Sequence, residues 1–521
     1  MVKVRWPRSR VPTFERVSSY AAEMARQFHL TLVLAMVIGV LTGLAVAGFD
    51  SAVQPAIDFV GDQPLLVVAI VPGLGLVAVN LLARLWHDDD TTTTDAYVRA
   101  YHQRGGRMGL SALWRKTVGS AITLGSGNAF GFEGPSMLIG GTIGSTVEHR
   151  FWSRLRRDDA KVLMAAGAAA GVAAVFKAPL TGVIFALEVP YRSDLARRAL
   201  LPCLVASGGA YLTFVAIIGT EPLFSTSGGA PFDLREIGGG LVLGLICGVL
   251  ARFGAQAVGR AKRLRLSRRW RVLGAVLGMA ALAPVAFWWF DAPLHLGPSY
   301  AAIEWASHPD RTVAVLCGLF VLRAMATWLG VAGGGMGGLF IPLVTQGAIT
   351  GSIFERFADA PNPRLFPTIG IAAFLGAGYR TPLAGVAFVA EATGEPGFLV
   401  PALLAAAAAQ LVMGRKSFST YQRQERLANT EPLSRLPIVD VMSPSADTIP
   451  ADMNLDDVVT TMLRQNRRWA PVVDDDGYVG VVAVRDIALL PRVEWPAMTA
   501  REIARTDVPP AAPHDTVEAG S

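Results

Sequence analysis

APLTGVIFALEV at residues 178–189 and TPLAGVAFVAEA at residues 381–392 are two similar stretches that lie 203 residues apart. A second matched pair lies directly upstream of them. It consists of EGPSMLIGGTIGSTVEHRF at residues 133–151 and GGLFIPLVTQGAITGSIFERF at residues 337–357. The apolar part of the chain is therefore a duplication of one unit.

Glycine and proline interrupt an apolar segment in each repeat, as GSGNAFGFEGP (125–135) and GVAGGGMGGLFIP (330–342). A lipid environment tolerates such a break only where the broken ends line a cavity. Breaks at corresponding positions of two repeats indicate a binding site near the middle of the membrane. The alternative, that the glycines serve only close helix packing, accounts less well for two matched breaks.

The order of residues in each break indicates the charge of the ligand. The glycines precede the apolar run in both repeats, so each break opens the N-terminus of a helix. The unpaired N–H groups at such an end carry about half a positive charge. Helix N-termini attract anions, and we therefore expect a small anion as the ligand.

The composition is that of an integral membrane protein, whose solvent is the lipid bilayer. Of the 521 residues, 52% are hydrophobic and 17% are charged, and the mean hydropathy is +0.41. Uncharged runs approach or exceed the ~20 residues that a spanning helix needs; they cover residues 30–49, 64–83, 199–220, 272–290 and 396–414. The first run is too long for a signal peptide, and we expect it to be retained.

Basic residues are concentrated beside the predicted spans, and the net charge is +6. They are Lys3, Arg5, Arg8, Arg10, Arg192, Arg197, Arg198, Arg260, Lys262, Arg263, Arg265, Arg268 and Arg269. By the positive-inside rule, the N-terminus and these loops face the cytoplasm. Because topology accounts for the clusters, no nucleic-acid partner is expected. We expect a multi-pass protein of the plasma membrane with both termini in the cytoplasm.

The residues of an intramembrane enzyme or metal centre are missing from the pattern. None of the seven histidines lies in the middle of a long apolar run, and no HExxH spacing occurs. Cys203, Cys247 and Cys317 lack metal-ligand spacing. We therefore expect neither enzymatic activity nor a metal or other cofactor.

In its two helix breaks and in the segment that follows the second repeat, the chain resembles the CLC family of chloride channels and chloride/proton antiporters. The resemblance covers about residues 30–430. GFEGP (131–135) is similar to the family's G-[KR]-E-G-P, GGLFIP (337–342) to its G-x-F-x-P, and STYQRQ (419–424) to the last segment, whose tyrosine faces the ion. The resemblance implies an all-α polytopic membrane protein with two inverted repeats of broken and re-entrant helices. It also implies a homodimer with a separate pore in each subunit.

The resemblance further assigns roles to individual residues. Glu133 would be the gate, a carboxylate that occupies an anion position and leaves when it is protonated or displaced. The anion would be bound by the Tyr421 hydroxyl and by the backbone N–H groups of Phe132, Glu133, Leu339, Phe340 and Ile341. The alternatives are that Glu133 only complements a helix N-terminus and that Tyr421 is an ordinary interfacial tyrosine.

The chain departs from the family pattern in two places that concern the anion. The serine motif G-S-G-x-P has no copy, and HDDDTTTTDAY (87–97) stands in its region. A threonine hydroxyl can donate the same hydrogen bond, and we assign this role to Thr92, although Thr91–Thr94 and Asp95 can also cap the next helix. Phe132 stands where the family usually has a basic residue, which weakens anion steering.

A third departure concerns protons. In the family's antiporters a glutamate near the inner surface relays protons, whereas here Val189 holds that position and Glu188 precedes it. Valine cannot carry a proton, and we expect Glu188 to cap a helix or to pair with Arg192. This favours a passive voltage- or pH-gated channel for chloride or a similar anion. Coupled chloride/proton antiport stays open, since coupling without that glutamate is conceivable in the family.

Beyond Gly414 the chain becomes polar and alternates in the order strand, helix, strand, turn, strand. This segment resembles a CBS motif. The predicted organisation is a basic N-terminus (1–29), the pore domain (30–430), the CBS-like motif (436–497) and the start of a second one (498–521). Because a nucleotide normally binds between two complete motifs, we expect dimer-stabilising packing rather than nucleotide binding.

Overall fold

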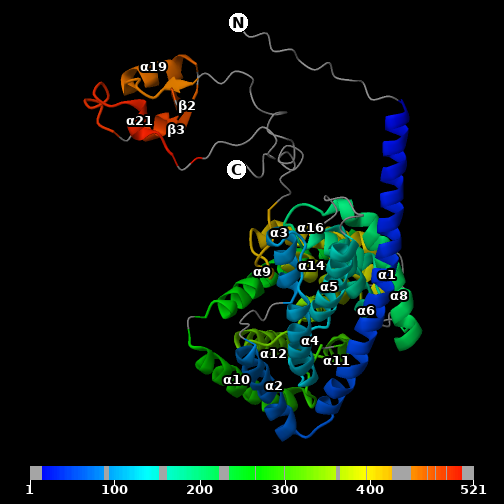
Figure 1. Ribbon diagram of the computed structural model, residues 1–521. Helices are drawn as coiled ribbons and strands as arrows, with labels where there is room; N and C mark the ends of the chain where they lie inside the picture. The colour runs from blue at the N-terminus through cyan, green and yellow to red at the C-terminus, as the bar shows by residue number, and fades with distance from the viewer. Residues whose placement is uncertain are drawn as a thin grey trace. The chain divides into compact units, whose positions relative to one another are not determined.

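This computed structural model describes residues 14–86, 93–151, 161–221, 234–264, 266–298, 300–358, 364–394, 396–424, 448–465, 467–475, 477–488, 490–506 and 508. The chain divides into two compact units, residues 1–426 and residues 427–521 (Figure 1).

Unit 1 contains helices that are long and apolar enough to cross a membrane, as the sequence predicts. Six such helices lie among the described residues, at 28–61, 65–85, 197–218, 236–262, 268–290 and 313–332. Their outward side chains are apolar; Trp288, for example, is 84% exposed. Large exposed apolar side chains on long helices are expected where lipid rather than water surrounds the protein.

The helices of unit 1 follow one another in two similar series. The first series consists of α1 (Phe14–Gly61), α2 (Leu65–Leu85), α3 (Thr94–Gln103), α4 (Leu110–Gly125), α5 (Glu133–Phe151), α6 (Val162–Phe176), α7 (Pro179–Glu188) and α8 (Leu200–Ile218). The second consists of α9 (Leu234–Lys262), α10 (Arg268–Phe290), α11 (Tyr300–Ser307), α12 (Val313–Ala332), α13 (Phe340–Glu355), α14 (Leu365–Tyr379), α15 (Pro382–Thr393) and α16 (Leu399–Met413).

Both series pack in the same way, which confirms the predicted repeat. Helix α1 packs against α8 (Figure 1) and α5 against α6, while α9 packs against α16 and α13 against α14. Glycines allow the close approach at equivalent places. A Cβ on Gly140 would lie 1.9 Å from the carbonyl oxygen of Gly167, and one on Gly347 would lie 2.4 Å from that of Gly370. Small residues at helix contacts are typical of membrane proteins.

The short helices α7 and α15 pack against each other and cap each other's N-termini. Each begins with proline, whose missing N–H group costs nothing at a helix start. Glu188, at the end of α7, accepts two backbone N–H groups at the start of α15, and Glu391, near the end of α15, accepts two at the start of α7. The distances are 3.2 Å to Leu383 N, 2.8 Å to Ala384 N, 2.8 Å to Leu180 N and 2.7 Å to Thr181 N.

Unit 2 is the small α/β segment that the sequence predicts. It contains β1 (Ile449–Pro450), α19 (Leu455–Arg464), β2 (Trp469–Asp474), β3 (Gly477–Ala483), α20 (Val484–Ile487) and α21 (Ala500–Ile503). Strand β2 is central, parallel to β1 and antiparallel to β3. The apolar face of α19 is buried through Leu455, Val458 and Met462, and these side chains belong to the core of unit 2.

Candidate functional site

The two broken segments meet each other. Gly131, from the first break, and Gly338, from the second, form an antiparallel bridge in which each N–H group donates to the other's carbonyl oxygen at 2.9 Å. Helix α5 begins two residues after Gly131, and α13 begins two residues after Gly338. The bridge therefore brings two helix N-termini to one place in the interior of unit 1.

Glu133 occupies the N-terminus of the opposite helix. Its side chain is buried, and Oε1 accepts the backbone N–H group of Phe340 at 2.5 Å. Glycine is required on both sides of this carboxylate, because a Cβ on Gly131 would lie 2.0 Å from Oε2 and one on Gly338 would lie 1.8 Å from Oε1. The carboxylate thus stands where the positive end of α13 would hold an anion.

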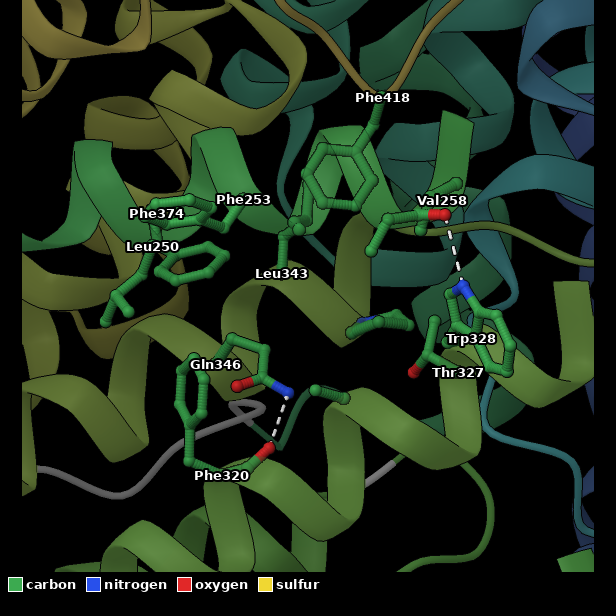
Figure 2. A pocket seen from close by; sticks show the side chains of 14 residues that line it. Leu250, Phe253, Val258, Phe320, Thr327, Trp328, Leu343, Gln346, Phe374 and Phe418 are labelled. Atoms are coloured by element: carbon green, nitrogen blue, oxygen red, sulfur yellow. Dashed lines mark hydrogen bonds between the residues drawn. The ribbon is translucent and has the colours of Figure 1, made fainter. Parts of the chain in front are cut away.

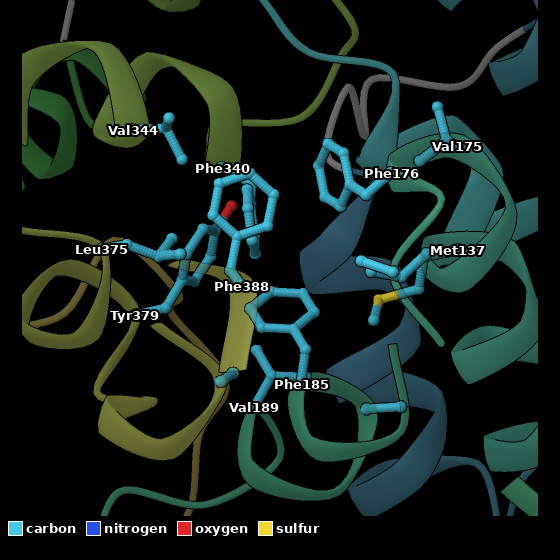
Figure 3. Packing of buried hydrophobic residues seen from close by; sticks show 14 of the residues in the cluster. Met137, Val175, Phe176, Phe185, Val189, Phe340, Val344, Leu375, Tyr379 and Phe388 are labelled. Carbon is cyan, nitrogen blue, oxygen red and sulfur yellow. The ribbon is translucent and has the colours of Figure 1, made fainter. Parts of the chain in front are cut away.

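The Phe340 ring is packed in a cluster of aromatic side chains (Figure 3). Its centroid lies 4.5 Å from that of Phe176 and 5.1 Å from those of Phe185 and Phe388. The contacts with Phe185 and Phe388 are edge-to-face, an arrangement that aromatic pairs prefer. The ring therefore anchors the first turn of α13, while its backbone N–H group faces the carboxylate.

The other backbone positions predicted to bind the anion lie at the same two helix starts. Phe132 immediately precedes α5, Leu339 is the residue before α13, and Ile341 is in its first turn. All three side chains are buried. Because the first four N–H groups of a helix have no partner within the helix, the N–H group of Phe340 is available to donate to the Glu133 carboxylate.

The predicted threonine lies outside the described residues, but its two neighbours line a small pocket. Thr92 is not described, whereas Thr93 and Thr94 line a pocket of about 40 Å³ together with Tyr379 and Phe418. Thr93 Oγ1 donates to the carbonyl oxygen of Gly337 at 3.0 Å. Thr94 Oγ1 is buried next to the Tyr379 hydroxyl without a hydrogen bond of normal geometry to any described residue. Of the two threonines, Thr94 is therefore the one whose hydroxyl makes no hydrogen bond of normal geometry to the main chain of the described residues.

Tyr421 lies away from this pocket. Tyr421 does not line this pocket; its ring lies against the Arg99 guanidinium, 5.2 Å from the ring centroid. Phe418, three residues earlier, lines the pocket instead, and its N–H group donates to the carbonyl oxygen of Gly378 at 2.9 Å. This hydrogen bond fixes the segment so that the phenyl ring, which has no hydroxyl, faces the pocket.

The proton-relay position contains no titratable group. Val189 is fully buried beside Phe185 (Figure 3), and its carbonyl oxygen accepts from Gln422 Nε2 at 2.9 Å. The Glu188 carboxylate accepts hydrogen bonds from the first N–H groups of α15 and not from Arg192. Capping, one of the two roles expected for Glu188, is therefore the one that the structure shows.

A larger cavity nearby is apolar. It has a volume of about 260 Å³ and lies between α9, α12, α13 and α14, with Phe418 at one end (Figure 2). Thr327 and Gln346 supply its few polar atoms, and Gln346 Nε2 already donates to the carbonyl oxygen of Phe320 at 3.2 Å. An anion has no donors here to replace its water, so the small pocket is the better candidate.

Comparison with known proteins gives the same answer as the paired helix breaks. The voltage-gated chloride channel family matches residues 74–414, and the CBS domain family matches residues 427–491. The chain belongs to the CLC family. It is 29% identical over 453 residues to the H+/Cl− exchange transporter ClcA of Cronobacter sakazakii, covering 80% of this chain and 94% of that protein.

Solved structures share the fold. A slow cyanobacterial Cl−/H+ antiporter matches with a TM-score of 0.66 and 25% identity, over 74% of this chain and 95% of that one. A CLC-type fluoride/proton antiporter matches in fold with a TM-score of 0.67 and 22% identity, over 80% of this chain and 100% of that one. The chain is therefore a multi-pass membrane protein of an anion-transporting family, and these relatives are transporters rather than enzymes.

Proposed function

We propose that this protein exchanges chloride, or a similar small anion, for protons across the membrane. Two relatives support this choice by name, the exchange transporter of Cronobacter sakazakii and the cyanobacterial antiporter. Their identity to this chain is 29% and 25%. From the sequence alone, Val189 favours a passive channel. We now propose exchange as the first choice and keep the channel as the second.

The observation that carries the proposal is the hydrogen bond between Glu133 and the Phe340 N–H group at 2.5 Å. An ionised carboxylate and a chloride ion compete for the same donors, because both are anions that seek a helix N-terminus. Protonation removes the charge of Glu133 and frees these donors. Proton binding and anion binding at one position are thereby linked, as exchange requires.

Around Glu133 we assign the anion to the N–H groups of the two helix starts and to the inner pocket. The N–H donors are those of Phe132, Glu133, Leu339, Phe340 and Ile341, and Thr94 replaces Thr92 as the hydroxyl donor. We further propose a homodimer of the plasma membrane with cytoplasmic termini, whose residues 30–430 form the pore domain. The CBS-like segment, residues 436–497, then stabilises the dimer without a nucleotide.

A passive channel remains the second candidate, favoured by Val189 and by the cap that occupies Glu188. The residue at position 189 cannot carry a proton, and the Glu188 carboxylate is held by the start of α15. If the protein is an exchanger, the proton therefore passes between Glu133 and the inner surface through water and not through the side chain of residue 189.

Reversal potentials of the purified protein in planar bilayers separate the two candidates. With a chloride gradient fixed, exchange predicts that the reversal potential moves when a pH gradient is imposed, and that chloride drives protons uphill in vesicles. A channel gives the chloride Nernst value at every pH gradient. Observation of the Nernst value throughout would reject exchange and select the channel.

A further inference from the structure

Lys262 places a positive charge at the inner pocket. It is the last residue of α9, and its side chain lines the small pocket beside Thr94 and Phe418. Its Nζ lies 2.9 Å from Asp95 Oδ2 and 3.1 Å from the carbonyl oxygen of Phe418. The other basic residues near the end of α9, such as Arg260 and Arg263, line a separate cavity.

The geometry leaves Lys262 one donor. A lysine ammonium has three N–H groups, and within the part of the chain that the structure describes two of them have acceptors, Asp95 and Phe418. The third is free for an occupant of the pocket. Because Asp95 is buried and the Lys262 side chain is only 22% exposed, an anion here interacts with the ammonium more strongly than it would in water.

Asp95 fixes both the lysine and the end of the pore segment. Its second oxygen, Oδ1, accepts from Ser419 Oγ at 2.7 Å and from Thr420 N at 3.0 Å. Asp95 thus joins α3, α9 and the segment that carries Phe418. Its negative charge also opposes an anion in the same pocket.

We propose that Lys262 binds the transported anion at the inner pocket, and that Asp95 positions Lys262 while lowering the anion affinity. The role of Lys262 rests on the proposed function. It adds a formal positive charge to a site where the family resemblance led us to expect only hydroxyl and backbone donors. The competing explanation is an ordinary ion pair that joins three segments and never meets the anion.

The two explanations differ in the sign of one effect. If Lys262 binds the anion, Lys262→Met weakens chloride binding and Asp95→Asn tightens it, because the repulsive charge is lost. Asparagine retains an oxygen for Ser419 and Thr420, so the segment keeps its hydrogen bonds. If the pair is only structural, both variants lower thermal stability, and they do not change the chloride affinity in opposite directions.

Calorimetric titration of the purified full-length protein with potassium chloride, against potassium gluconate as background, measures these affinities. We expect Kd to rise about tenfold or more in Lys262→Met, to fall by about threefold in Asp95→Asn, and to change little in Lys262→Arg. Lys177→Met is the matched control, since Lys177 Nζ donates to the carbonyl oxygen of Glu221 instead.

A double variant covers the case in which Lys262→Met leaves Asp95 unpaired and unfolds the protein. Lys262→Met with Asp95→Asn carries neither charge and should bind chloride more weakly than the wild-type protein but more tightly than Lys262→Met, because the repulsive charge of Asp95 is lost as well. An unchanged Kd in that folded variant, or equal weakening in both single variants, would overturn the assignment. If the wild-type protein itself binds no chloride, the proposed function fails rather than this inference alone.

Discussion

The two helix breaks occupy matching places in the repeats but carry different side chains, whereas α7 and α15 match in both place and chemistry. Glu133 and Phe340 each lie two residues before the proline of their break. Glu133 supplies a carboxylate, and Phe340 supplies the backbone N–H group that donates a hydrogen bond to it. By contrast, Glu188 and Glu391 perform the same capping task for each other's helix. Symmetry in this molecule holds the fold together, and its loss at one pair of positions creates the site.

The largest expected effect follows from removing that asymmetry. In Glu133→Gln the side chain is neutral at every pH and no longer competes as an anion for the Phe340 N–H group. Anion flux in vesicles should persist at or above the wild-type rate and lose its dependence on pH, and uphill proton movement should disappear. A folded variant without any anion flux would show that Glu133 is not the gate.

A smaller effect should come from the glycines that accommodate the carboxylate. In Gly338→Ala the new Cβ would lie 1.8 Å from Glu133 Oε1, so the carboxylate must leave this position. A destabilisation of ~1.4 kcal/mol already lowers its occupancy tenfold. Anion flux at pH 7.5, measured with a chloride electrode, should rise toward that of Glu133→Gln.

Gly208→Ala is the control for this substitution, because its Cβ would meet nothing within 4 Å. Flux in the control should equal that of the wild-type protein. Flux in Gly338→Ala no higher than in the control would mean that the carboxylate does not block the anion in the position seen here.

The matched pair Glu188 and Glu391 should respond alike. Glu188→Ala and Glu391→Ala each leave two N–H groups at a helix start without their acceptors, and an unsatisfied N–H group that is shielded from water costs about 1–3 kcal/mol. Thermal unfolding in detergent should show similar destabilisation in both variants. Glu188→Gln should retain the wild-type coupling ratio; loss of coupling in Glu188→Gln, but not in Glu391→Gln, would make Glu188 a proton relay and break the equivalence.

The smallest effect concerns Tyr421. Because its ring contacts Arg99 and lies away from the inner pocket, Tyr421→Phe should leave the chloride affinity within about twofold of the wild-type value. Phe418→Tyr adds a hydroxyl at the pocket and should tighten chloride binding if the added group reaches the anion. Calorimetric titration of both variants decides which residue faces the anion, and a clear loss of affinity in Tyr421→Phe alone would return the role to Tyr421.

The sequence predicted the membrane fold and the position of Glu133 because the two repeats and their breaks are local patterns. It missed the cap by Glu391, which is a contact over more than 200 residues, although the repeat offset that relates Glu391 to Glu188 was visible. It chose Tyr421 over Phe418 because residue type guided the choice in a segment without helical periodicity. Lys262 escaped notice because the positive-inside rule already accounted for every basic residue at the membrane exits.

The reciprocal caps have a consequence for how the duplicated halves depend on each other. Residues 14–218 on their own would leave the start of α7 without Glu391, and residues 234–413 on their own would leave the start of α15 without Glu188. Each fragment would present two N–H groups at a helix start whose acceptor belongs to the other half. The halves are therefore obligate complements rather than two domains, and a split version of the protein should assemble only when both pieces are made together.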